Sequence, residues 1–207
     1  GIKHNAASEG QHLIHFLIGK INGTLVGLVD GNYGNDTSTT GAFTMNTLRT
    51  NSGGWNSSHM RKTVLDSNSA SATSPAANTL LAALPADLRA VMKPATKYSD
   101  NTGGGSNTAS YVTATRDLLT LLAEFEYFGV RTYANSAEQN YQAQYDYYKA
   151  GNSKIHYKHN ATGTAAFAHC RSANSGDTSF FCRAAPYNNI TIGYSDDSFA
   201  IAPCFFV

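Results

Sequence analysis

Residues 170–189, CRSANSGDTSFFCRAAPYNN, set aromatic and apolar side chains among small polar ones close to the C-terminus. Further short runs of this kind, separated by Gly, Asn, Asp and Ser, occupy residues 154–159, 165–171, 189–195 and 200–207. Runs of β-prone residues bounded by such residues are typical of strands joined by turns and loops. No helix signal interrupts them. The sequence therefore predicts a small, mostly antiparallel sheet with long loops in this part of the chain.

Strands are also expected earlier in the chain. The apolar runs 12–18 and 24–29 are joined by Asn22 and Gly23, a dipeptide that supplies the positive φ of a tight turn, so they predict a hairpin. Other β-prone ranges flank the Gly-rich loop NTGGGSNT, and the apolar run LLTLL is typical of a buried strand. These ranges are 93–100, 111–129 and, within the latter, 118–122.

Short helices are expected between these strands. Asn56 or Ser57 can cap a helix whose apolar side includes Met60. Ser74 can cap a second helix that stops at Pro85, and the residues after Pro85 can form another turn or two. Together with the strands, these helices indicate the α+β class.

The range 136–151 predicts one further helix, with Ser136 as cap and Gly151 as stop. Its tyrosines recur at helical spacing, which favours packing over binding. These tyrosines are Tyr141, Tyr145 and Tyr148.

The composition disfavours several kinds of partner. The 207 residues carry a net charge of +1 and only 14% charged side chains, so no basic face for nucleic acid is expected. No apolar run approaches the roughly 20 residues that span a membrane, so no membrane insertion is expected. The many Tyr, Gly, Asn, Ser and Thr residues are typical of extracellular and virion proteins. The sequence shows no signal peptide and begins with Gly1 instead of Met, so we expect a processed or trimmed start.

The three cysteines do not form a disulfide framework, because their number is odd. All three lie near large apolar residues, which favours buried thiols that pack as small hydrophobic side chains. One bridge plus one free thiol is the alternative. The cysteines are Cys170, Cys182 and Cys204.

Seven motifs occur in the order in which a known family carries them: GGWNSSHMRK, LPADLRAVMKPATK, TRDLLTLLAEFEYFG, QYDYYKAGNSKIHYKHN, CRSANSG, FFC and IAPCFFV. Over roughly residues 13–207 the chain resembles this family, a domain of unknown function from gut bacteria and their phages. The family in turn resembles the C-type-lectin-like fold, with a Gly-Val-Arg/Ala-Pro-type motif in its final strand. The equivalent here is Ala200-Ile201-Ala202-Pro203.

The resemblance implies a single C-type-lectin-like domain over residues 1–207, with short helices packed around a small, mostly antiparallel sheet with long loops. It also implies a variable region at about residues 165–207. Proteins of this fold are variable targets of diversity-generating retroelements. These elements mutate adenine-bearing codons of the C-terminal loops, while the core β residues stay fixed.

One segment departs from the family. Where this chain has residues 167–173, family members usually carry a run of tryptophans followed by Leu-Arg-Ser-Pro. Arg171 and Ser172 are kept, but the flanking aromatic residues are not. Diversification of these positions would produce this difference, and so would simple divergence of this copy.

The residue types of the tail agree with a contact surface. Tyr, Ser, Gly and Asn are favoured in antibody contact surfaces, because they give contact area and hydrogen bonds at modest entropic cost. Strand alternation directs one set of residues toward the core: Phe181, Ile190, Ile192, Ile201 and Phe205. The outward set is Arg183, Ala185, Tyr187, Asn189, Thr191 and Tyr194. The predicted ligand-binding face consists of Phe167, Ala168, His169, Ala173, Asn174, Asp177, Arg183, Ala185, Tyr187, Asn188, Asn189, Thr191, Tyr194 and Asp196. An ordinary polar surface without a binding role is the alternative.

No metal and no cofactor is expected. A calcium-dependent sugar site needs several converging oxygen ligands. The lectin triplets Glu-Pro-Asn, Gln-Pro-Asp and Trp-Asn-Asp are absent, and Asp196 and Asp197 form a lone acidic pair. The histidines lack the spacing of transition-metal motifs.

Two carboxylates and one arginine have a structural interpretation. Glu124 and Glu126 could share a strand face and offer paired carboxylates, but bonds to backbone or arginine groups are favoured. Arg171 lies beside the expected core, and a buried arginine needs a partner. We expect that partner to be Glu124, Glu126 or Asp117.

The preferred hypothesis is a ligand-binding, receptor-recognition protein with a diversified C-terminal surface. Its expected partner is a protein or glycan on a host or neighbouring cell surface, and its expected location is the virion (a phage tail) or the outside of a cell. One alternative is a structural virion or cell-surface component. The weaker alternative is an enzyme of the formylglycine-generating type, because adjacent residues such as His169 and Cys170 point to opposite faces of a strand. We therefore expect no enzyme, and the sequence does not indicate an oligomeric state.

Overall fold

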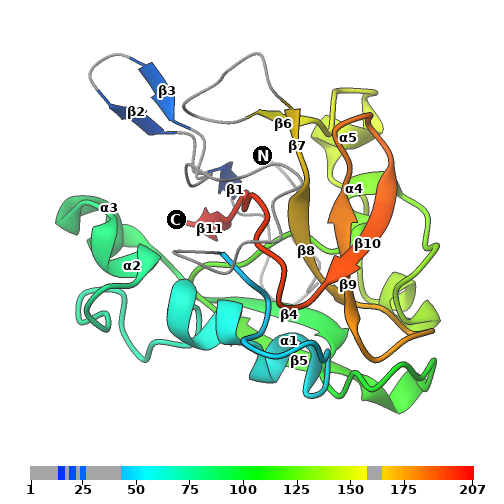
Figure 1. Cartoon of the computed structure of the whole chain (residues 1–207). Coiled ribbons are helices and arrows are strands. Elements are labelled where there is room, and N and C mark those ends of the chain that lie inside the picture. The colour runs from blue at the N-terminus through cyan, green and yellow to red at the C-terminus, as the bar shows by residue number, and fades with distance from the viewer. Residues whose placement is uncertain (1–13, 17–18, 22–23, 27–42, 158–164) are drawn as a thin grey trace.

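The computed structural model describes residues 43–157 and 165–207 and the backbone of three short segments, 14–16, 19–21 and 24–26. Short helices and small antiparallel sheets make up the fold, in agreement with the predicted α+β class (Figure 1). The strands are β1 Ile14–Phe16, β2 Gly19–Ile21, β3 Thr24–Val26, β4 Ala95–Asp100, β5 Val112–Asp117, β6 His156–Tyr157, β7 Ala165–Ala166, β8 Ala168–Ala173, β9 Phe180–Ala184, β10 Ile190–Tyr194 and β11 Cys204–Phe206. The helices are α1 Gly54–Ser57, α2 Leu80–Ala83, α3 Ala86–Val91, α4 Glu124–Phe128 and α5 Asp146–Lys149, with a π-helical turn η2 Met60–Val64 and 3₁₀ turns η3 Ala109–Tyr111 and η4 Ser136–Asn140.

The C-terminal part forms an antiparallel sheet of β8, β9 and β10, as predicted from its short apolar runs. We call it the tail sheet. β9 lies in the middle, and Figure 1 shows the three strands side by side. Cys182 of β9 stands opposite Ile192 of β10, and the pairing of β8 shifts register between His169 and Ala173. The ladder of β8 with β9 is therefore irregular between these two residues.

Both faces of the tail sheet are covered by apolar side chains. Phe181 of β9 packs in a cluster with Trp55 and Met60, whereas its neighbour Cys182 packs in a cluster with Tyr127. Because side chains alternate along a strand, β9 contributes to two cores at once. Exposed residues in this part of the chain must therefore come from loops and strand ends.

The expected core residues are largely confirmed. Ile192 is half-buried, and the other four residues predicted to point inward are buried: Phe181, Ile190, Ile201 and Phe205. The three cysteines are free and buried, as predicted for thiols that pack as small hydrophobic side chains.

The predicted N-terminal hairpin is only partly right. β2 and β3 pair antiparallel, with Ile21 opposite Thr24, while Asn22 and Gly23 themselves lie outside the described residues. β1 does not belong to this hairpin, because it pairs with β11 at the other end of the chain. Of the other predicted strands, those at β4 and β5 are confirmed, and they pair along their whole length.

The prediction of a strand through residues 118–122 is wrong. These residues are buried, but their only bridge within the described residues joins Thr120 to Cys204. The following residues form α4 instead of a strand. The Glu126 carboxylate accepts the backbone N–H of Ala123 at 2.9 Å, and Gly129 ends the helix with a left-handed φ of 68°.

Two predicted helices are shorter than expected. The helix expected from Ser74 begins only at Leu80, because Asn78 takes a positive φ and the Thr79 hydroxyl caps the first turn. The range 136–151 is divided into η4 and α5. Between them, the side-chain amide of Gln142 donates to the carbonyl of Tyr98 at 2.8 Å, which holds the chain away from a helical path.

The two-sided burial of β9 gives a stability prediction. The variant F181A should lose about 3–5 kcal/mol of unfolding free energy, because Phe181 is 1% exposed and its removal leaves a cavity. The control is Y187A, whose tyrosine is 64% exposed and should contribute about 0.5 kcal/mol or less. Urea denaturation measures both values. Equal losses in the two variants would contradict the assignment of inward and outward residues.

Candidate ligand-binding face

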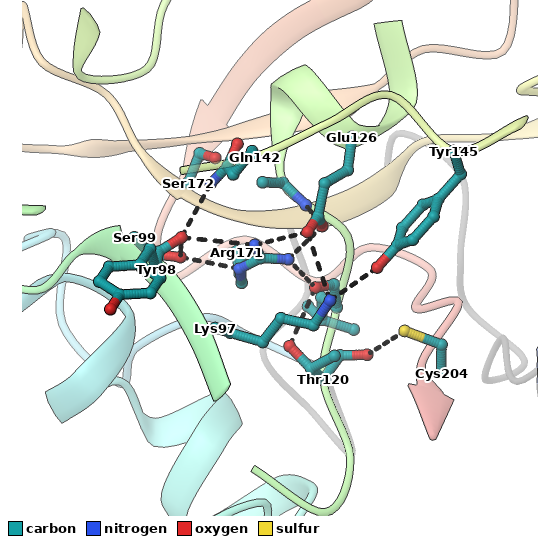
Figure 2. A network of polar contacts seen from close by, with 12 residues as sticks. Lys97, Tyr98, Ser99, Thr120, Glu126, Gln142, Tyr145, Arg171, Ser172 and Cys204 are labelled. Atoms are coloured by element: carbon teal, nitrogen blue, oxygen red, sulfur yellow. Dashed lines mark hydrogen bonds and ion pairs between the residues drawn. The ribbon is translucent and has the colours of Figure 1, made fainter. Parts of the chain in front are cut away.

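A buried arginine lies at the centre of the scaffold that carries the tail sheet. Arg171 projects from β8, and its guanidinium forms a bidentate ion pair with Glu126 of α4 (Figure 2). It also donates to the Ser99 hydroxyl at 2.7 Å and to the Leu121 carbonyl at 2.8 Å. These bonds join three segments that are distant in sequence: β8, β4 and residues 121–126. The prediction that Arg171 pairs with one of three acids is confirmed, and the acid is Glu126.

A second buried cation shares the same carboxylate. Lys97 of β4 lies 3.4 Å from Glu126 and donates to the Tyr145 hydroxyl at 2.6 Å (Figure 2). Burial lowers the pKa of Lys97. Burial alone would raise the pKa of Glu126, but the charges of Arg171 and Lys97 outweigh it and hold this pKa at about 2. Glu126 therefore stays ionised, and both Arg171 and Lys97 contact its single negative charge.

A second buried carboxyl supports β8 from the other side of Arg171. The Ser172 hydroxyl donates to Glu138 at 2.6 Å, the Gln142 amide donates at 3.1 Å, and the backbone N–H of Asp100 donates at 2.8 Å. Burial raises the pKa of Glu138 to about 7, although these donors oppose the rise.

Glu124 satisfies the backbone, as the favoured interpretation predicted. Its carboxylate accepts N–H groups of Thr132 and Ala134 at 2.6 Å and of Tyr133 at 3.1 Å, so it closes the loop after α4. Burial raises the pKa values of the nearby Cys170 and Cys182 thiols well above their usual range. These two thiols are therefore protonated at neutral pH and are poor nucleophiles.

Neither a metal cluster nor a membrane span occurs in the described part of the chain. No group of three or more His, Cys, Asp or Glu side chains there could hold a metal ion. Asp196, one member of the lone acidic pair, forms an ion pair with Arg49 at 3.1 Å. No helix among the described residues is long and apolar enough to cross a bilayer.

The structure divides the predicted ligand-binding face into three sets. The exposed residues are Asp177, Tyr187, Asn188, Asn189 and Tyr194. The half-buried residues are Phe167, Arg183, Thr191 and Asp196. The buried residues are Ala168, His169, Ala173, Asn174 and Ala185, so their placement on an outer surface is wrong. Whether the exposed residues bind a ligand stays a prediction.

The contacts of three of these residues show what encloses them. The ring of His169 contacts the carbonyl of Phe43 at 2.9 Å, and burial lowers its pKa to about 3. The carbonyl of Asn174 accepts the side-chain amide of Asn51 at 3.0 Å. Ala185 donates its N–H to the carbonyl of Asn189 at 2.7 Å and so closes the β9–β10 turn from inside.

The exposed β9–β10 turn is held by its own hydrogen bonds. Asn188 takes a left-handed φ of 64°, a conformation that asparagine tolerates better than most residues. Its N–H donates to the Ala185 carbonyl at 3.2 Å, and its side chain accepts the N–H of Lys154 at 2.8 Å. Tyr187 and Asn189 are therefore presented on an ordered turn.

A stack of side chains lies at the C-terminal end of β10, away from the β9–β10 turn. Tyr194 stacks on Phe180 with ring centroids 4.5 Å apart, and the guanidinium of Arg49 lies 3.8 Å from the Tyr194 ring. Beside Arg49, an open depression of about 350 Å³ is lined in part by Leu48 and Lys62. Sequence reasoning missed Arg49, because no local pattern links it to Asp196, which is 147 residues away.

Comparisons of this chain with protein-family models, curated proteins and solved structures gave no match. The α+β class therefore stands on the described fold alone. The C-type-lectin-like assignment, which the motif order suggests, stays a prediction.

The shared carboxylate gives the first prediction for this scaffold. The variant E126Q leaves Arg171 and Lys97 buried without a counter-charge, so we expect a loss of about 3–5 kcal/mol of unfolding free energy, measured with urea. The control D196N breaks only an exposed ion pair and should leave the unfolding midpoint nearly unchanged. An E126Q midpoint equal to that of the wild type would exclude the central role of Glu126.

Glu138 gives a prediction for pH dependence. Its pKa is about 7 in the folded protein and near the ordinary value of 4.5 in the unfolded chain, so the folded state binds the extra proton between these values. The stability contributed by Glu138 is therefore complete below about pH 4.5 and falls as pH rises through about 7. Urea denaturation from about pH 5 to pH 8 should show the wild type losing stability relative to E138Q. If E138Q does not fold, carboxyl NMR of the wild type measures the same pKa, and a value near 4 refutes the prediction.

Proposed function

We propose that this protein is a ligand-binding protein that recognises a receptor through a diversified C-terminal surface. The observation that carries the proposal is the exposed group Tyr187, Asn188, Asn189 and Tyr194, which belongs to a tail sheet whose strands are otherwise largely buried. Contact with a partner, and not catalysis, is the role that this arrangement supports best.

The chemistry of the exposed group suits recognition of a macromolecular surface. Tyrosine offers a large, rigid contact area together with a hydroxyl group, and asparagine offers both donors and acceptors. Antibody contact surfaces use these residue types for the same reasons. Tyr187 and Tyr194 are 64% and 37% exposed, which leaves aromatic area for a partner to cover.

The scaffold supports variation of this surface. The Arg171–Glu126 ion pair joins β8 to α4, and Phe181 packs β9 against the cluster that includes Trp55 and Met60. Neither side chain depends on the exposed turn for its contacts. Substitutions at Tyr187 or Asn189 therefore change the face without opening the core, which is how a rigid scaffold can carry variable loops.

On this proposal the fold belongs to the C-type-lectin-like group, and the protein acts on a phage tail or on a cell surface. Its partner is a protein or glycan on a host or neighbouring cell. The enzyme alternative loses support, because it would use Cys170 or Cys182 and both thiols are buried and protonated.

The neighbouring DNA tests the proposal. We expect a near-copy of the tail-coding sequence beside a reverse-transcriptase gene, with differences confined to adenines of the coding template. The differences should fall in codons of exposed residues, such as Tyr187, Asn189 and Tyr194, and spare those of Arg171 and Phe181. Related copies that vary evenly along the whole chain would refute diversification.

A further inference from the structure

We propose that Arg183 forms a carboxylate-binding site, and that in this copy of the domain it binds an acidic side chain of a protein partner. The inference rests on the proposed recognition function and names the chemistry of one anchor on the face. Arg183 lies on β9 and is half-buried at the edge of the exposed turn.

Two aromatic rings hold the Arg183 guanidinium. Its Cζ atom lies 3.8 Å from the centroid of the Phe167 ring and 4.3 Å from that of the Phe199 ring. Rings that contact a guanidinium in this way attract its charge and leave its hydrogen-bond donors free. The side chain is therefore positioned by its neighbours before any ligand arrives.

Within the described residues, the donors of Arg183 have no partner. Its Nε atom is buried and makes no hydrogen bond, and no acid forms an ion pair with the side chain. Asp197 is close enough to influence the pKa of Arg183 but does not bond to it. Burial lowers that pKa only to about 10, so the side chain stays charged at neutral pH.

The other arginines that approach acids set the contrast. Arg49 pairs with Asp196 at 3.1 Å, and Arg61 pairs with Asp117 at 2.7 Å. Arg171 has Glu126. Arg49 and Arg183 both contact aromatic rings, but among the described residues Arg49 has a carboxylate partner and Arg183 has none. The missing acid of Arg183 is the group that a ligand would supply.

The absence of a side chain at Gly193 leaves the space that the Arg183 side chain occupies. A Cβ atom at Gly193 of β10 would lie 2.6 Å from the Phe199 ring and 2.9 Å from Cδ of Arg183. Both distances are too short for real atoms, so only glycine at this position leaves room for the two side chains. Three segments of the tail thus converge on the site: the residue before β8, the β9–β10 pair and the loop after β10.

A carboxylate is the ligand that fits best. The planar fork of a guanidinium matches the two oxygens of a carboxylate, and such bonds are stronger where water is partly excluded. Tyr187 stands beside the site, with its ring centroid 6.4 Å from that of Phe167, and can contact the ligand's neighbouring atoms. Tyrosine, asparagine and arginine together are typical of contacts with proteins, which favours Asp or Glu of a protein partner over an acidic sugar.

The experiment follows the Arg183 Nε–H signal by ¹⁵N NMR in the full chain. The probes are N-acetyl-glutamate amide, its uncharged match N-acetyl-glutamine amide, and glucuronate. We expect a saturable shift of this signal with the glutamate probe only. R183M lacks the Arg183 signal, so its binding is followed by the backbone amide signal of Tyr187, which lies beside the site. R183M should abolish the shift that the glutamate probe causes in this amide signal in the wild type, and G193A, which displaces Arg183, should weaken the binding about tenfold or more. The matched control R49M should leave it unchanged.

Each other outcome overturns the inference. An equal response to the glutamine probe, or none to any probe, excludes a carboxylate site, as does an Arg183 signal already paired with an acid of the same chain. Tighter binding of glucuronate assigns the site to acidic glycans and refutes the protein partner. The DNA comparison is independent of these results, so failure of diversification and failure of the Arg183 site are distinguished.

Discussion

The Glu126 carboxylate is the constraint on which the rest of the structure depends. It lies between Arg171 of β8 and Lys97 of β4, and none of the three side chains is exposed. Removing charges from water is costly, so both cations tolerate burial because Glu126 supplies a negative charge between them. Because the three residues come from a strand pair, a helix and the tail sheet, their contacts fix the positions of these elements. The tail sheet is thereby anchored by charge as well as by apolar packing.

In the tail sheet, the buried residues support the fold, whereas the exposed residues can be substituted without opening the core. Side chains of β9 enter two cores, and β8 is buried along its length, so neither strand presents a continuous face. What remains exposed is the β8–β9 loop at residues 176–178, the β9–β10 turn and the end of β10. The recognition surface that we propose is therefore smaller than the tail that carries it. The surface consists of a few ordered side chains, with Arg183 at their inner edge.

The sequence predicted those features for which a single physical requirement decides the structure. A buried arginine needs an acid, so the pairing of Arg171 was accessible, and short apolar runs between turn residues indicated the tail sheet. The role of Lys97 was not accessible, because a lysine in a six-residue strand gives no sign that its side chain is enclosed. Strand alternation predicts that Ala185 points outward, but the residue is buried. Alternation distinguishes the two faces of a strand and does not indicate whether other residues cover one of them. The prediction of one helix over 136–151 is wrong for a related reason: the bond from the Gln142 side chain to the distant Tyr98 carbonyl outweighs local propensity.

If the tail is diversified as proposed, the same geometry limits how far it can vary. Ala168, Ala184 and Ala200 fill one small cluster, and Gly193 lies under Phe199 and Arg183 without space for a Cβ atom. Larger residues at these positions would push apart elements that the ion pairs hold together, and overpacking a core is destabilising. Arg183 is different, because its tip reaches the surface while its stem is enclosed. Exchanging it would change the chemistry that a ligand meets and would leave the small residues beneath it in place. Specificity in such a protein can therefore depend on single side chains at the border between core and turn.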